Sequence, residues 1–248
     1  MIRGIYTAAA GMVSSVTRLM RLTNNMANIA TPGYKQDLSP TDTFDALLLA
    51  RIDAQTGAPA TIGPLTTYLV ADRTELDLGQ GNLRQTGRDL DLAVSGEGFF
   101  VVQRDGDTYY TRNGSFLVGA SGQLQTEDGG SVLGEGGPLT FGPGMIGVSA
   151  DGTMSVDGVS AGRLSVVTFP QGTALRKVGD SYFQAEGATP VAVARPQVAQ
   201  GFLEESNVDA ARSMLDLLAT QRSFSASQRL LQLQDAALQK AVNEIGRL

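Results

Sequence analysis

Both ends of the chain place apolar or small side chains at alternating steps of three and four residues. This heptad spacing is typical of a helix that buries one stripe against a partner helix. The N-terminal stripe contains Ile2, Ile5, Ala9, Met12, Val16, Leu19, Thr23 and Met26. The C-terminal stripe has one fully apolar column, Leu217, Phe224, Leu231, Leu238 and Ile245. Because a lone amphipathic helix is marginal in water, we expect the ends to pair with each other or with copies of the chain.

The second column of the C-terminal stripe is more polar than the first. The heptad spacing places Met214, Gln221, Gln228, Asp235 and Val242 in this second column. Buried polar residues in such a stripe fix register and partner at a cost in stability. We therefore expect a specific helix pairing, with Ser206 or Asn207 capping the start of the helix.

The middle of the chain, residues 72–200, has the pattern of a β domain. Short apolar or alternating stretches recur between turn pairs, which are Asp105-Gly106, Asn113-Gly114, Ser121-Gly122, Asp128-Gly129, Asp151-Gly152 and Asp157-Gly158. Asn-Gly and Asp-Gly suit type I′ hairpin turns, because both central residues tolerate positive φ. The spacing predicts an antiparallel meander. The expected fold is thus a mainly β central domain flanked by N- and C-terminal α-helices that pair as a coiled coil.

Four segments are expected along the chain. They are an N-terminal assembly helix with an Asn-rich motif (1–35), an extended linker or loop segment (36–71), the all-β domain (72–200) and a C-terminal assembly helix (201–248). A turn at Thr31-Pro32-Gly33 is expected to follow the first helix. Within the linker, residues 44–52 have the pattern of a short helix and residues 55–64 that of a loop.

The composition excludes several classes of chemistry. The 248 residues include no Cys and no His, which removes thiol catalysis, disulfides and the commonest general base and zinc ligand. We predict no catalytic residue, no cofactor and no metal site, and therefore no enzyme. The net charge of −6 argues against nucleic acid as a partner, and no small-molecule substrate is expected. The N-terminus lacks the continuous apolar core of a cleaved secretory signal peptide.

Two patterns nevertheless match, in part, a catalytic site and a dinucleotide-binding site. Asp89, Asp91 and Glu97 are a candidate carboxylate set for a cell-wall hydrolase, although an ion pair with Arg84 or Arg88 is the commoner use of such residues. We expect Asp89 and Asp91 to share one face of a strand. Residues 142–147 match Gly-x-Gly-x-x-Gly, but the proline and the missing downstream acid favour a tight β turn over a dinucleotide site.

Three asparagines follow the first heptad stripe, at Asn24, Asn25 and Asn28. One asparagine near a helix end is explained by its bonds to free backbone groups. Three at this spacing lie on neighbouring faces of a helix. We expect their amides to hold the following turn and to contact a neighbouring subunit.

Four strings in the sequence resemble the signatures of the flagellar rod and hook protein family. They are residues 23–35 (TNNMANIATPGYK), 87–102 (GRDLDLAVSGEGFFVV), 110–116 (YTRNGSF, taken as a hairpin) and 201–208 (GFLEESNV), the last followed by QRSF at 221–224. They occur in the family's order and span nearly the whole chain.

The resemblance implies a structural protein of the bacterial flagellar basal body. Members of this family are exported without cleavage through the flagellar type III apparatus. They polymerise helically with copies of themselves and with other rod subunits, pairing their terminal helices around a central channel. The assembly residues implied on this chain are the apolar stripe residues of both ends together with the three asparagines.

The length of the chain and the short 36–71 segment indicate which rod protein the sequence resembles most. With the string VLGEGGPL at 132–139, these features are most similar to the proximal rod protein, and the distal rod protein is the alternative. From other classes, a carboxylate-based wall hydrolase and a secreted β-domain adhesin stay open. The adhesin would not need the helical ends, and the hydrolase would cleave polysaccharide.

Overall fold

The computed structural model describes residues 2–38, 46–52, 59–66, 75–170, 172–179, 181–185 and 187–245. The chain divides into two compact units, each taken by itself below. The helical unit contains residues 1–26, 37–75 and 210–248, and the β unit contains residues 27–36 and 76–209. Residues 27–36, which include Asn28 of the Asn-rich motif, thus belong to the β unit.

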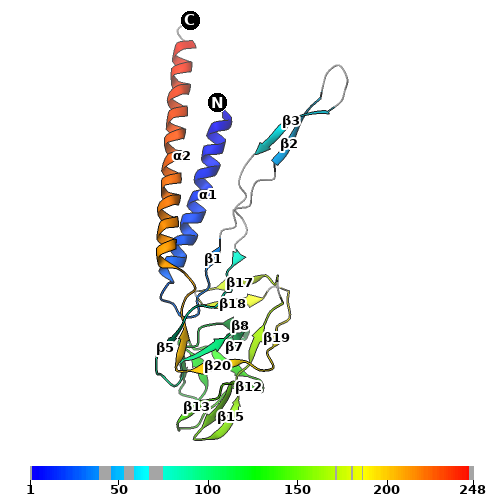
Figure 1. Cartoon of the computed structure of the whole chain (residues 1–248), viewed down its shortest axis with the longest axis vertical. Helices are drawn as coiled ribbons and strands as arrows, with labels where there is room; N and C mark the ends of the chain where they lie inside the picture. The colour runs from blue at the N-terminus through cyan, green and yellow to red at the C-terminus, as the bar shows by residue number, and fades with distance from the viewer. Residues whose placement is uncertain are drawn as a thin grey trace. The chain divides into compact units, whose positions relative to one another are not determined.

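Two long helices dominate the helical unit. Helix α1 spans Ile2–Ala27 and helix α2 spans Ala210–Ile245, so helices are confirmed at both heptad-patterned ends. The two helices run side by side (Figure 1) and contact each other, since a methyl group added at Gly11 would lie 3.6 Å from Ser227 Oγ. This close approach requires a small residue on each helix.

The predicted helix and loop within the linker are wrong. Strand β2 (Ala46–Ile52) pairs antiparallel with strand β3 (Pro59–Thr66), from Ala46 opposite Thr66 to Ile52 opposite Pro59. A five-residue aliphatic run does not by itself distinguish a short helix from a strand, and here the pairing partner decides. Residues 44 and 45 and residues 55–58 of these predictions lie outside the described residues. Short strands β1 (Asp37–Leu38) and β4 (Glu75–Leu76) flank this segment.

The β unit is built on a ten-stranded sheet with the main order β17-β18-β8-β7-β11-β10-β9, to which β12, β16 and β19 attach. Its strands are β7 (Phe99–Arg104), β8 (Asp107–Thr111), β9 (Phe116–Val118), β10 (Leu124–Thr126), β11 (Ser131–Gly134), β12 (Gly137–Pro138), β16 (Val166–Thr168), β17 (Leu175–Val178), β18 (Tyr182–Ala185) and β19 (Val191–Ala192). The strand order places strands that are distant in sequence beside each other, so the predicted meander is wrong, although these strands pair antiparallel as expected. Strand β7 pairs with β8 along one edge, and along the other edge with β16 at Phe99 and Phe100 and with β11 at Val102 and Gln103.

Smaller sheets complete the β unit. A three-stranded sheet has the order β13-β14-β15, and two pairs join β20 to β6 and β21 to β5. Their bounds are β5 (Leu83–Gln85), β6 (Leu92–Ser95), β13 (Ile146–Val148), β14 (Thr153–Val156), β15 (Val159–Arg163), β20 (Gln197–Gln200) and β21 (Phe202–Glu204). The pairing of β21 with β5 ties the segment before α2 into the β unit.

The core of the β unit consists of two apolar clusters on the two faces of β7. Phe100 and Val102 belong to one cluster, and Phe99 and Val101 belong to the other. Alternate residues of a strand point to opposite faces, so this six-residue strand supplies both clusters. Phe100 packs edge-on against Phe116 with ring centroids 5.2 Å apart.

Two of the six predicted turn pairs have positive φ at both central residues. At Asp105-Gly106 the φ values are 54° and 90°, and at Asp157-Gly158 they are 50° and 86°. The other pairs do not form type I′ turns. The pair Asn113-Gly114 is also not the hairpin that its motif predicted, since β9 pairs with β10 rather than with β8. There, Asn113 Oδ1 accepts a hydrogen bond from Ser115 N–H at 3.0 Å.

Candidate functional site

The signature strings of the sequence converge on one buried ionic cluster in the β unit. Lys35 Nζ lies 2.6 Å from Glu204 Oε1, and Arg112 Nη1 lies 3.0 Å from Glu204 Oε2. The side chains of Lys35 and Glu204 have no exposed surface, and that of Arg112 is 4% exposed. The three residues come from three separate strings of the family resemblance. We call them the motif triad.

The Glu204 carboxylate organises the motif triad because it accepts three charged or backbone donors. Besides the two cations, the N–H of Gly81 donates to Oε1 at 3.0 Å. Lys35 donates a second hydrogen bond to the Gly79 carbonyl at 2.6 Å, and Arg112 donates to the Gly96 carbonyl at 2.7 Å. Every cationic head of the triad is therefore also bonded to backbone.

Burial acts against the charged forms of both cations. It lowers the pKa of Lys35 and of Arg112, and the charge and hydrogen bonds of Glu204 oppose that shift. A buried cation without its partner is strongly destabilising. The triad consequently holds only when the segments before α2 and after α1 are both in place.

The segment that carries Lys35 is fixed by its neighbours as well. Gly33 has a φ of 69°, and its N–H donates to the Glu204 carbonyl at 2.8 Å. A methyl group at Gly33 would lie 2.2 Å from Asn113 N, so no larger residue fits. Tyr34 is fully buried, with Lys177 Nζ 3.9 Å from its ring centroid. Lys177 also donates to the Lys35 carbonyl at 2.8 Å.

Asn207 extends this junction instead of capping a helix as predicted. Its Oδ1 accepts from Gln36 N–H at 2.8 Å, and its Nδ2 donates to the Asp77 carbonyl at 2.9 Å. Helix α2 begins only at Ala210. Ser206 Oγ accepts from Val208 N–H at 3.3 Å, ahead of the helix.

The three predicted asparagines hold different backbone segments. Asn25 is buried and bonds Asp37 in both directions, donating to its carbonyl at 2.9 Å and accepting from its N–H at 3.0 Å. Asn28 Oδ1 accepts from Thr31 Oγ1 at 3.1 Å, within the turn. Asn24 is exposed. Two of the three amides therefore hold the backbone after α1, and contact with a neighbouring subunit stays a prediction.

One of the two predicted columns of α1 is covered within the chain, and the other is displaced by one residue from the positions that are covered. Ile5, Met12, Leu19 and Met26 are all half-buried, and Ala9 is as well, but Val16 and Thr23 are exposed. The covered positions that complete the heptad lie one residue earlier, at Ala8, Ser15 and Leu22. The side chain of Ile2 lies outside the described residues.

Helix α2 shows the same displacement. Its first column is half-buried as far as it is described, at Leu217, Phe224, Leu231 and Leu238, and the side chain of Ile245 lies outside that set. All five residues of the predicted second column are exposed in the single chain, so α1 does not cover them, and their burial against another copy stays a prediction. The covered column again lies one residue earlier, at Ser213, Thr220, Ser227 and Gln234. Periodicity alone did not separate the two columns, because Met214 and Val242 are apolar and Ser213 and Thr220 are not.

The hydroxyls of the covered columns are satisfied on their own helices. Ser15 Oγ donates to the Gly11 carbonyl at 2.7 Å, Thr220 Oγ1 to the Asp216 carbonyl at 2.7 Å and Ser227 Oγ to the Ser223 carbonyl at 3.1 Å. Such bonds back to residue i−4 satisfy these three hydroxyls within their own helices, whereas Gln234 Oε1 in the same column of α2 is buried without a hydrogen-bond partner. The helices can therefore approach closely without a polar bond between them.

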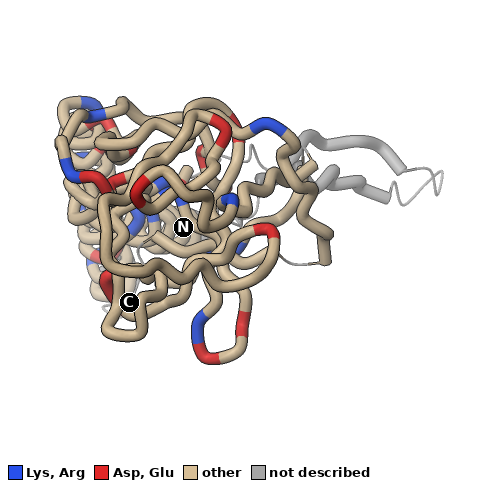
Figure 2. The backbone as a smooth tube through the Cα atoms, turned by 90° about the horizontal axis from the view of Figure 1, so that it is seen from below, with Lys and Arg blue, Asp and Glu red and all other residues tan. Residues whose placement is uncertain are grey.

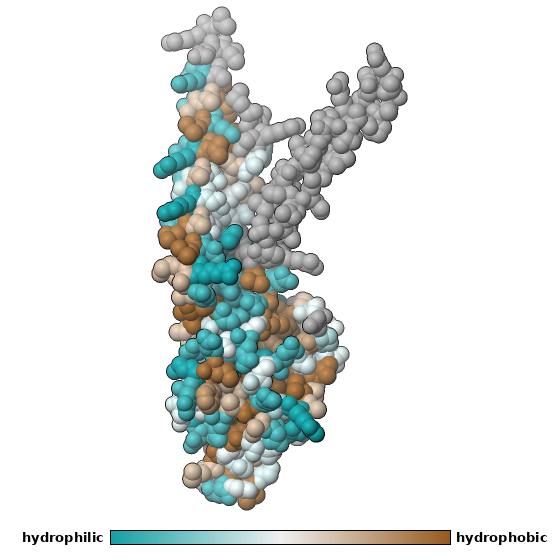
Figure 3. Space-filling view, viewed as in Figure 1, coloured by the Kyte–Doolittle hydropathy of each residue, from teal (hydrophilic) through white to brown (hydrophobic). Residues whose placement is uncertain are grey.

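Both helices carry a second apolar stripe that stays exposed. On α1 it contains Tyr6, Val13, Val16 and Met20, which are 71%, 68%, 40% and 69% exposed. On α2 it contains Leu215, Leu218, Leu230 and Leu233, which are 67%, 47%, 53% and 70% exposed. Figure 3 shows hydrophobic side chains along α2 with hydrophilic ones between them. Exposed apolar side chains grouped in this way indicate an interaction surface.

The candidate carboxylate set does not form the expected pair. Asp89 is exposed in a turn, whereas Asp91 is 1% exposed and lies 3.6 Å from Arg88 Nη1. The two residues therefore do not share a strand face, and Arg88 is the ion-pair partner that the sequence allowed. Glu97 is exposed and contributes charge near Arg112. Among the described residues, no group of three or more acidic side chains is placed to hold a metal ion.

Comparison with known proteins identifies the family. Residues 93–165 match the family described as flagellar hook protein FlgE/F/G D1 domain, and residues 199–244 match the flagellar basal body rod FlgEFG protein C-terminal family. The chain is 33% identical to flagellar basal-body rod protein FlgF of Salmonella typhimurium, with 92% of each chain covered. It is 29% identical to flagellar basal-body rod protein FlgG of Bacillus subtilis, covering 98% of this chain and 99% of that protein.

These similarities extend over nearly the whole chain, through both helices and the motif triad. The chain therefore belongs to the family of flagellar basal-body rod proteins, and it is a structural subunit of the rod. Its location is the flagellar basal body. In the part of the chain that is described, no helix is long and apolar enough to cross a membrane.

The motif triad is the site that sequence reasoning missed. The sequence did offer one signal, because Lys occurs at only three positions, 35, 177 and 240. Two of these three meet at the same junction. In a chain with few lysines, a lysine that lies inside a signature string is a candidate for a buried ion pair.

Proposed function

We propose that this chain is a rod subunit that polymerises helically into a hollow shaft, which transmits torque and lets exported subunits pass. In this proposal α1 and α2 pair as a coiled coil on the inside of the tube, and the β unit lies outside. The observation that carries it is the second, exposed apolar stripe on each helix. The helices contact each other with their covered columns and keep another face free for neighbouring copies.

The energetics support assembly through these faces. Burying apolar surface stabilises by roughly 25 cal/mol per Å². A head-to-tail contact repeated by a screw operation extends as an open polymer, which a rod requires. The partners in this proposal are copies of the chain, other rod subunits and the flagellar export apparatus, through which the chain passes without a cleaved signal peptide. The chain acts without catalysis.

Charge on the β unit fits a protein partner better than a nucleic acid. Figure 2 shows basic and acidic positions interspersed along its loops rather than gathered by sign. With a net charge of −6, this view offers nucleic acid no basic face. Within the rod we favour the proximal position, on the length of the chain and the short 36–71 segment, and the distal position is the alternative.

The test is complementation of a deletion of this gene. Full-length protein is expected to restore swimming and a complete rod in images of isolated basal bodies. Val13→Asp with Met20→Asp should abolish rod formation, because both residues lie on the exposed stripe and neither is needed to fold α1. Thr7→Asp, exposed on α1 but outside both stripes, is the control that should assemble. An intact rod and normal swimming without the gene would overturn the proposal.

A further inference from the structure

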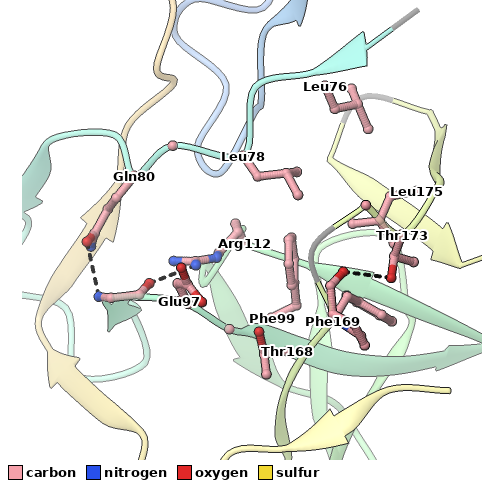
Figure 4. A pocket seen from close by; sticks show the side chains of 15 residues that line it. Leu76, Leu78, Gln80, Glu97, Phe99, Arg112, Thr168, Phe169, Thr173 and Leu175 are labelled. Carbon is pink, nitrogen blue, oxygen red and sulfur yellow. Dashed lines mark hydrogen bonds between the residues drawn. The ribbon is translucent and has the colours of Figure 1, made fainter. Parts of the chain in front are cut away.

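The β unit contains an apolar pocket that its own residues leave open. The cavity measures about 510 Å³ and is walled by Leu76, Leu78, Phe99, Phe169 and Leu175. Figure 4 shows these side chains around the hollow, contributed by β4, the segment after it, β7, the segment after β16, and β17. This volume lies within the range of pockets that bind a partner group.

The pocket is held in shape before anything enters it. Gly96 is fixed from both sides, since its N–H donates to Gln80 Oε1 at 3.0 Å and its carbonyl accepts from Arg112 Nη2 at 2.7 Å (Figure 4). The rings of Phe99 and Phe169 lie 5.8 Å apart, and the Arg112 guanidinium lies 5.2 Å from the Phe99 centroid. A preformed pocket loses little entropy on binding.

The charge of the pocket is already balanced. Arg112 is paired with Glu204, and Glu97 adds a second acidic side chain to the wall. An anionic ligand would therefore compete with internal carboxylates. The lining includes three leucines and two phenylalanines. The occupant that fits is therefore an apolar side chain, and methionine is one that adapts to irregular space and packs favourably against aromatic rings.

A fitting side chain is presented elsewhere on the same unit. Met145 is 80% exposed and Val159 is 72% exposed, and both border the three-stranded β13-β14-β15 sheet. We call Met145 and Val159 together the knob. The backbone at Met145 is fixed, because Met145 N–H donates to Asp157 Oδ1 at 3.0 Å and its carbonyl accepts from Asp157 N–H at 3.0 Å. A methyl group at Gly144 would lie 2.4 Å from Asp157 Oδ2, so the turn is closely packed.

The knob and the pocket lie at opposite ends of the β unit. In Figure 1 the strands β13 and β15 are at one end and β17, which lines the pocket, is at the other. One copy therefore cannot fill its own pocket. A repeated contact between unlike ends is the heterologous arrangement that an open polymer needs.

We propose that Met145 and Val159 of one copy insert into the Leu78–Phe99–Phe169 pocket of the next copy, as a head-to-tail contact between β units. This inference rests on the proposed function, because it needs copies of the chain aligned along one axis. Met145 adapts to the pocket through its three rotatable bonds, and Val159 fills the remaining width. This contact is a second interface between copies, in addition to the one proposed through the exposed stripes of the helices.

The absence of cysteine from the chain permits a direct test. Met145→Cys with Leu78→Cys places one thiol on the knob and one on the pocket rim, where Leu78 is 39% exposed. Mild oxidation of assembled rods should give a ladder of disulfide-linked dimers and larger species on non-reducing gels, which collapses to the monomer on reducing gels. The matched control is Val118→Cys with Leu78→Cys, since Val118 is 37% exposed on β9 at the far edge of the sheet.

The outcomes separate this contact from the rod function. A ladder for the knob–pocket pair and at least tenfold less for the control supports the contact. Rods that assemble but give no ladder, or equal ladders for both pairs, overturn the contact and leave the rod function standing. Failure of the unmodified chain to restore a rod would instead overturn the function.

A second variant guards against a poorly folded cysteine mutant. Met145→Asp keeps the turn bonds, in which residue 145 takes part only through its backbone N–H and carbonyl, and should reduce copies joined in the rod at least tenfold. The unfolding midpoint of the purified chain should stay unchanged. Normal rods with Met145→Asp would contradict the proposal.

Discussion

The ammonium of Lys35 and the carboxylate of Glu204 lie 2.6 Å apart with no exposed surface, although 169 positions separate them in the chain. One belongs to the string that follows α1 and the other to the string that precedes α2. The two segments that enter the β unit are thus joined by a bond that neither could make alone.

Glu204→Gln should strongly destabilise the β unit. The amide keeps the shape of the side chain but leaves the buried cations of Lys35 and Arg112 without an anion, which costs about 3–5 kcal/mol. Urea unfolding followed by tyrosine fluorescence measures the loss. The adjacent Glu205→Gln is the control, because Glu205 and its partner Arg84 are 43% and 56% exposed. It should cost under about 1 kcal/mol, and equal losses in the two variants would refute the assignment.

Asn25→Ala should release the backbone of Asp37. The Asp37 N–H donates to Asn25 Oδ1 at 3.0 Å, and the alanine removes that acceptor. Hydrogen exchange of the Asp37 amide should therefore accelerate at least ~10-fold, as expected for the loss of about 1.4 kcal/mol of protection. Asn24→Ala, at an exposed neighbouring position, should leave that amide unchanged. Unaltered exchange in Asn25→Ala would show that the bond contributes nothing.

Tyr182 should make the β unit lose stability at alkaline pH. Burial and a hydrogen bond from its hydroxyl to Asp128 raise the pKa of Tyr182 to about 12, whereas unfolded tyrosine titrates near 10. Between these values the unfolded chain has lost the proton and the folded chain retains it, so stability falls as pH rises. The fall should be roughly 1 kcal/mol after solvent screening.

The alkaline fall is measured by comparing denaturation curves of the wild type and Tyr182→Phe from about pH 9 to about pH 12. The stability difference between them should shrink over this range, because phenylalanine does not ionise. Tyr109→Phe, whose ring packs 5.9 Å from that of Tyr182, keeps the Tyr182 hydroxyl and should retain the fall. A constant difference between wild type and Tyr182→Phe would contradict the prediction.

Gly114→Ala should destabilise the β unit through a steric clash rather than through strain in a turn. A methyl group there would lie 1.6 Å from the Leu92 carbonyl oxygen, in the string that predicted only a hairpin. The backbone has to move, at a cost of about 3 kcal/mol or more. Gly136→Ala is the control, since nothing lies within 4 Å of its added methyl group. Thermal unfolding of both variants tests this, and similar midpoints would count against it.

Substitutions at Gly11 should separate helix propensity from helix packing. Gly11→Ala fits, because the methyl group meets Ser227 Oγ at 3.6 Å, and it should favour α1 by up to about 1 kcal/mol. Gly11→Leu overfills the same space and should weaken the contact of α1 with α2. Circular dichroism of helix melting reports both effects. Leucine as stabilising as alanine would mean that the helices do not pack there.

The sequence by itself determined the helices at both ends, the β character of residues 72–200 and the family. These features follow from local periodicity, turn chemistry and ordered strings. One column of each heptad stripe was also predictable, because Ile5, Met12, Leu19 and Met26 and their counterparts on α2 are apolar at seven-residue spacing.

Only the tertiary structure decided the rest. The covered second column of α2 begins with Ser213, Thr220 and Ser227 rather than with their apolar neighbours, because the close approach of Gly11 to Ser227 favours small residues over hydrophobic ones. The strand pair of residues 46–66 and the position of β7 between distant strands depend on pairing partners that periodicity does not name. The motif triad was likewise invisible, since Lys35, Arg112 and Glu204 read singly as surface charges. A buried charge exists only where the fold brings its counter-charge, and that is a property of chain segments meeting in space.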